Sequence, residues 1–116
     1  MNEIKRLGAG ERWSDVVIYG GVARWVEVPE QFDLDARQQI EQVLNQIDAT
    51  LAQIGSQKAH VLEVLIFLAD LADKPVFNEL WDRWVVPGQA PIRAAVQAGL
   101  HASCRVEMIV TTAVPD

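Results

Sequence analysis

Two charged side chains, Arg93 and Glu107, lie in segments that otherwise have the composition of buried strands. A planar guanidinium grips a carboxylate through two parallel hydrogen bonds, and a carboxylate can accept and return a proton. An arginine beside a glutamate therefore has the chemistry of an anion-binding site with a general base. The simpler alternative is a cross-strand ion pair on a solvated or interface face. The pattern alone leaves both interpretations open.

The alternation of polar and apolar residues predicts a strand around each of the two charged residues. In 92–98 the even positions are apolar and Arg93 is on the polar side, which is the period of a strand with one face in a core. The segment 104–110 has the same parity, with Glu107 on its polar side. We therefore expect both side chains to point away from the core. An antiparallel hairpin closed by residues 99–103 would put them diagonally opposite on one sheet face, about 7 Å apart.

The remaining elements follow from residue periodicity and turn residues. The other segments with β-type composition are 2–7, 16–19, 22–28 and 60–68. The apolar stripe after the acidic linker predicts a helix over 36–54, capped by Asp33 or Asp35. A second helix is expected over 73–84, with a proline in its first turn. The order is β, ββ, α, β, α, ββ, which indicates an α+β fold with roughly six strands.

Two helices can cover only one face of such a sheet, since a helix is about 10 Å wide and strands are about 4.8 Å apart. Apolar residues on the other face, such as Leu65 and Phe67 or their even-numbered neighbours, then need a partner. We therefore expect a homo-oligomer that packs sheet to sheet.

Composition limits the class of protein. The 116 residues, 50% hydrophobic and 22% charged, suffice for one domain over 1–116 with a sizeable core. A net charge of −6 with scattered basic residues disfavours nucleic acid as a partner. The single cysteine, Cys104, cannot form an intrachain disulfide and is expected to be a packed thiol. No apolar run resembles a signal peptide or a membrane span, so we expect a cytoplasmic protein without membrane contact.

Other residues with chemical potential give weaker signals. His101 and Cys104 form a single pair that does not make a metal site by spacing, and no nucleotide motif occurs, so no metal or cofactor is expected. Trp13 lies in a glycine-containing loop, either as a plug at the edge of the core or as a lid over a pocket. Glu27 is most simply a solvated charge at the end of a strand.

Several longer motifs follow one another in the same order as these elements. They are ERWSDVVIYGG, QIDATLAQIGS, VLIFLADLAD, FNELWDRWV and, above all, APIRAAVQAGL followed by VEM. In this order they resemble the Rid family, also called YjgF, over nearly the whole chain, and the RWSD and VQAGL forms resemble a divergent branch. The resemblance implies a chorismate-mutase-like fold, with a mixed sheet of about six strands and two helices on one face. It also implies a homotrimer with sites between subunits.

The resemblance implies roles for individual residues. Arg93 matches the arginine that binds the carboxylate of an imine or enamine amino-acid derivative. Glu107 matches the glutamate that positions or activates the attacking water, so that the products are a 2-oxo acid and ammonia without any cofactor. Asn78 matches an asparagine near the family's site, although a helix asparagine facing water is an equal alternative.

Several positions depart from the pattern of the active branch, including Leu100-His101, where the family has a Leu-Pro pair one residue further from the arginine. Trp13 replaces a tyrosine, and an indole can donate but not accept a hydrogen bond. Glu27 replaces a glycine that lines the pocket, and its carboxylate would repel an anionic ligand unless it turned outward or paired with Arg12 or Arg24. The alternative function is therefore a non-catalytic trimer of the same fold that binds small ligands or other proteins.

Overall fold

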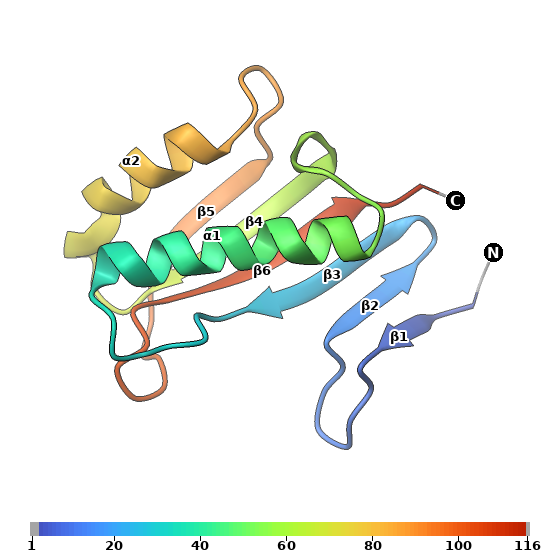
Figure 1. The fold of residues 1–116 in the computed structure, drawn as a ribbon, viewed down its shortest axis with the longest axis horizontal. Helices are drawn as coiled ribbons and strands as arrows, with labels where there is room; N and C mark the ends of the chain where they lie inside the picture. The colour runs from blue at the N-terminus through green and yellow to red at the C-terminus, as the bar shows by residue number, and fades with distance from the viewer. Residues whose placement is uncertain (1–2, 116) are drawn as a thin grey trace.

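A computed structural model describes residues 3–115 as a six-stranded sheet with two helices on one face (Figure 1). The elements are β1 (Lys5–Leu7), β2 (Val16–Tyr19), β3 (Val22–Glu27), α1 (Ala36–Gln53), β4 (Val61–Leu68), α2 (Lys74–Trp84), β5 (Ile92–Gln97) and β6 (Val106–Ala113). Strand order is β1-β2-β3-β6-β4-β5, and only β4 and β5 run parallel. The predicted elements, their order and the mixed sheet are thus confirmed.

Helix α1 begins at a capping box and lies across the centre of the sheet. Asp35 accepts a hydrogen bond from the backbone N–H of Gln38 at 2.8 Å, and the Gln38 side chain accepts one from the backbone N–H of Asp35 at 3.2 Å. The cap is therefore Asp35 rather than Asp33. The apolar stripe packs against β3 and β6 and is buried at Ile40, Val43, Leu44, Ile47 and Leu51. No helix within residues 3–115 is long and apolar enough to cross a membrane.

The predicted hairpin between β5 and β6 is wrong, because β4 lies between these two strands. Helix α2 forms the crossover of a β4–α2–β5 unit, so β5 returns parallel to β4 at the sheet edge. The eight-residue strand β6 pairs antiparallel with both β3 and β4 at the centre. Residues 98–105 therefore cross the end of β4, where the backbone N–H of Ala98 donates to the carbonyl of Leu68.

The predicted orientation of Arg93 is also wrong. Arg93 pairs in register with Val64, which is fully buried under the helices, so Arg93 faces the helix side. The apolar even residues of β5 face the other side, where Ile92 is 71% exposed and Val96 is 46% exposed. A two-residue period shows which residues share a strand face, but it does not show which face packs on the core. At an edge strand the apolar face need not be the one that the helices cover.

The sheet face opposite the helices has no cover within the described chain, and it is largely apolar. Its apolar members, given by strand register and exposure, are Val17, Tyr19, Val22, Val26, Leu65, Phe67, Ile92, Ala94, Val96 and Ile109. Its polar residues include Arg24, Thr111 and Glu63, which lie side by side on β3, β6 and β4. An apolar face of this extent is typical of a subunit interface.

Candidate functional site

Arg93 is held on an aromatic platform formed by α2. Its guanidinium carbon lies 5.6 Å from the centre of the Phe77 ring and 5.5 Å from that of Trp81. Within residues 3–115, no carboxylate oxygen lies within 4.0 Å of Arg93. The two rings hold the guanidinium in place by cation–π contacts, and its N–H groups remain able to donate hydrogen bonds. This arrangement is suited to bind a carboxylate supplied from outside the chain.

Asn78 lies on the same helix as this platform, next to Phe77 and one turn before Trp81. Its carbonyl oxygen is buried and has no hydrogen-bond partner among the described residues. A buried, unpaired oxygen costs about 1–3 kcal/mol, so a donor is missing at this position. The alternative that Asn78 simply faces water does not hold for this oxygen.

Glu107 lies on the opposite face of the sheet from Arg93. It pairs in register with Phe67 on β4, whose side chain faces away from the helices. The expectation that Glu107 points away from the core is correct, but the expectation that it shares a face with Arg93 is wrong. The sheet separates the two groups, so the same small ligand cannot reach both of them within one chain.

Trp13 lies in the loop between β1 and β2, at the other end of the sheet from Arg93. Its side chain is 69% exposed, so the prediction that it plugs the edge of the core is wrong. Between β2 and β5 there are four strand spacings, or about 19 Å. Of the four predicted site residues, Arg93 therefore lies against α2, the helix that carries Asn78, while Glu107 and Trp13 lie elsewhere.

Glu27 is a bound carboxylate rather than a solvated one. One oxygen accepts hydrogen bonds from the indole N–H of Trp25 at 2.9 Å and from the Thr50 hydroxyl at 3.2 Å. The other accepts from the Gln46 amide at 3.0 Å. The carboxylate therefore points under α1 and away from the uncovered face, and it pairs with neither Arg12 nor Arg24. The shared parity of Trp25 and Glu27 was the available sequence signal for this network.

A buried glutamine, which the sequence analysis missed, fixes the chain just before Glu107. Gln39 is fully buried, and its carbonyl oxygen accepts a hydrogen bond from the backbone N–H of Arg105 at 2.7 Å. Its amide nitrogen lies 3.0 Å from the carbonyl oxygen of Ser103. The Arg105 side chain in turn forms an ion pair with Asp73, just before α2, at 2.6 Å. These contacts connect the start of β6 to both helices.

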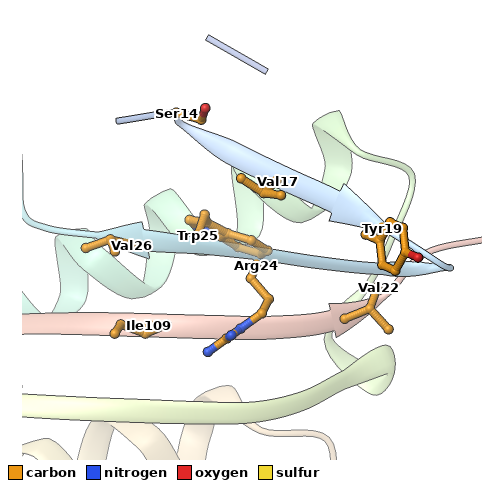
Figure 2. A pocket seen from close by; sticks show the side chains of 8 residues that line it. All are labelled: Ser14, Val17, Tyr19, Val22, Arg24, Trp25, Val26 and Ile109. Carbon is orange, nitrogen blue, oxygen red and sulfur yellow. The ribbon is translucent and has the colours of Figure 1, made fainter. Parts of the chain in front are cut away.

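A hollow of about 620 Å³ lies on the uncovered face over β2, β3 and β6 (Figure 2). Its lining residues are mostly apolar and come from these strands and the loop before β2: Ser14, Val17, Tyr19, Val22, Arg24, Trp25, Val26 and Ile109. Arg24 is the one basic residue among them, and its Nε donates to the Thr111 hydroxyl at 3.1 Å. The hollow lies on the same face as Glu107.

Neither cysteine nor metal chemistry gains support from the geometry. Cys104 is 3% exposed, which confirms it as a packed thiol. Burial raises the pKa of this thiol, and the nearby charge of Glu107 raises it further. Within residues 3–115, no group of three or more histidine, cysteine, aspartate or glutamate side chains is arranged to hold a metal ion.

The fold and the motifs identify the class of protein. Residues 4–114 match the family model described as Endoribonuclease L-PSP, and the chain belongs to this family. Its fold is the YjgF-type, chorismate-mutase-like α+β fold that the motifs predicted.

Particular relatives match over nearly the full chain. The RutC family protein YoaB of Escherichia coli is 46% identical over 112 residues, which cover 96% of this chain and 98% of that protein. A YjgF family protein from Neisseria meningitidis has a crystal structure that is 40% identical, with a TM-score of 0.91 and coverage of 98% of this chain and 97% of that one. A more distant relative is the chloroplastic Reactive Intermediate Deaminase A of Arabidopsis thaliana. It is 34% identical over 76 residues, which cover 63% of this chain and 40% of that protein.

Proposed function

We propose that this protein hydrolyses imine or enamine derivatives of amino acids to 2-oxo acids and ammonia. The observation that carries the proposal is the guanidinium of Arg93, which rests on two aromatic rings without a carboxylate partner in the described chain. A bidentate bond from this group would fix a small 2-imino carboxylate beside α2. The deaminase name of the Arabidopsis relative supports the same reaction class.

The proposed site lies between two copies of the chain in a homotrimer. Arg93 and Asn78 of one copy would face Glu107 and the Trp13 loop of the next. Within one chain Glu107 lies on the opposite sheet face from Arg93, and the Trp13 loop lies towards the opposite edge. The uncovered apolar face supports such packing, because it would otherwise expose large side chains such as Ile92 and Val26 to water.

The side chains of Arg93 and Glu107 supply the groups that the reaction requires. Arg93 binds the carboxylate and holds the imine carbon in place. Glu107 accepts a proton from water as the water oxygen bonds to that carbon, which gives a carbinolamine. The proton then passes from Glu107 to the nitrogen. Glu107 takes the hydroxyl proton as the C–N bond breaks and the carbonyl forms, and the departing ammonia takes up that proton. Water and the protonated imine thus become a 2-oxo acid and an ammonium ion, with atoms and charge in balance.

The test is the rate at which 2-aminoacrylate, generated in situ, disappears. We expect wild type to be faster than buffer, Arg93→Ala to fall to the buffer rate, and Glu107→Gln to lose most of the rate while retaining ligand affinity. Arg83→Ala on α2 and Glu41→Gln on α1 are matched controls, because both residues are exposed and neither is among the residues assigned to the site. Both controls should retain the wild-type rate.

The same assay separates the proposal from the alternative of a non-catalytic trimer. If wild type is no faster than buffer across several imines, the enzymatic function is refuted. Binding of 2-oxobutyrate that depends on Arg93 would then establish the ligand-binding alternative. The replacement of a hydroxyl by the Trp13 indole favours this alternative, because it removes a group that could accept a proton.

A further inference from the structure

The hollow on the uncovered face contains a second arginine that the proposed reaction does not use. Arg24 projects from β3 into this hollow, and Figure 2 shows its side chain leaning across β6 towards Ile109. The hydrogen bond from its Nε to the Thr111 hydroxyl, at 3.1 Å, fixes the base of the guanidinium. The two terminal amino groups are left to bind something else.

The described chain offers these amino groups no counter-charge. No carboxylate oxygen within residues 3–115 lies within 4.0 Å of Arg24. Glu63 is on the same face, but it lies on the far side of Thr111, two strand spacings or about 10 Å away at the backbone. The neighbours Val17, Val26 and Ile109 are apolar, which strengthens any ion pair formed there.

The position of Arg24 relates it to the proposed site. Arg24 is in register with Thr111, and Glu107 lies on the same face four residues further along β6, about 14 Å from Arg24 at the backbone. The Arg24 side chain leans along this line towards Ile109, which shortens the gap that a dicarboxylate has to bridge between its guanidinium and Glu107. One end of such a ligand would lie at Glu107 and the incoming Arg93 of another copy, and the other end at Arg24.

We infer that Arg24 determines specificity by binding a second carboxylate, so that the substrates are imines of acidic amino acids. This inference rests on the proposed function for the location of the first carboxylate, at Arg93. A guanidinium prefers a planar anion that it can bind with two hydrogen bonds, and a side-chain carboxylate supplies one. Imines with apolar side chains would lose this interaction and bind more weakly.

The experiment measures binding of two stable 2-oxo acids, 2-oxoglutarate and 2-oxobutyrate, by calorimetry on the intact assembly. A charged hydrogen-bonded pair corresponds to about a 10- to 100-fold preference for 2-oxoglutarate in wild type. Arg24→Gln should remove this preference and leave 2-oxobutyrate binding unchanged. Arg24→Lys should retain part of it, because lysine keeps the charge but not the fork. Arg6→Gln, on the same face but outside the hollow, is the matched control.

Each outcome decides between the two claims. Equal affinity of wild type for both acids overturns the role of Arg24 and leaves the proposed function intact. Loss of both ligands in Arg93→Ala, but loss of the preference alone in Arg24→Gln, supports both claims. If neither acid binds wild type, both claims are refuted. If Arg24→Gln changes the mass of the assembly, Arg24 pairs with another subunit and the specificity role is overturned.

Discussion

Replacing Gln39 with methionine should destabilise the protein by about 2–3 kcal/mol. Gln39 accepts one hydrogen bond, from the backbone N–H of Arg105, and its amide nitrogen has only two hydrogens to share among the carbonyls of Phe32, Leu34 and Ser103. Three hydrogen bonds at about 1 kcal/mol each give about 3 kcal/mol, and the apolar methionine in the same volume offsets part of this. The loss should lower Tm by roughly 5–10 °C.

The assay is urea unfolding at a fixed protomer concentration, since assembly would make the midpoint depend on concentration. The control is Gln38→Met, the same change at the adjacent exposed residue, where one cap hydrogen bond is lost. Its cost should be about 0.5 kcal/mol. Hydrogen exchange of the Arg105 amide should become faster in Gln39→Met alone. A loss below 1 kcal/mol, or one equal to the control, would refute the view that Gln39 fixes the chain ahead of Glu107.

Three other predictions concern groups outside the proposed site. The Cys104 thiol should react with a disulfide reagent more slowly than free cysteine at pH 8, because its raised pKa leaves less thiolate; an equal rate in the folded protein would contradict its burial. The hydrogen bond from Arg37 lowers the pKa of Glu79, so the stability that Glu79 adds relative to Glu79→Gln should be complete above pH 4.5 and disappear as pH falls through the lowered pKa. A stability difference between wild type and Glu79→Gln that increases as the pH falls would contradict this prediction. Asp73→Asn should cost about 1 kcal/mol in urea unfolding, because Arg105 loses its partner, and no measurable change would mean that the ion pair contributes nothing.

The sequence predicts the elements of this fold better than their pairing. The capped stripe of α1 and the strand runs depend on local periodicity, and they occur where expected. The pairing of β5 depends on a tertiary feature, the crossover through α2, which places it parallel to β4. The hairpin prediction treated the order along the chain as order in the sheet. It thereby placed Arg93 on the face of Glu107.

The sequence indicated which residue types could form the candidate site, but not how these residues are arranged in space. Arg93 packs against α2, the helix that carries Asn78, and their roles in a site stay predictions. Glu27 was misjudged, and for Trp13 the plug alternative was wrong, because exposure and hydrogen bonding depend on what packs above a residue. Nothing in the described chain covers Trp13, and α1 covers Glu27. The periodicity of apolar residues along the sequence, two for strands and 3.6 for helices, does not show which other element packs over a given residue.

The most direct test of the central claim is a crystal structure of the protein with 2-oxobutyrate bound. We expect the carboxylate of the ligand to accept two hydrogen bonds from Arg93 at about 2.7–2.9 Å, with Glu107 of a different copy beside the carbonyl carbon. A ligand bound away from Arg93, or a site that contains no Glu107 from another copy, would contradict the proposed intersubunit site.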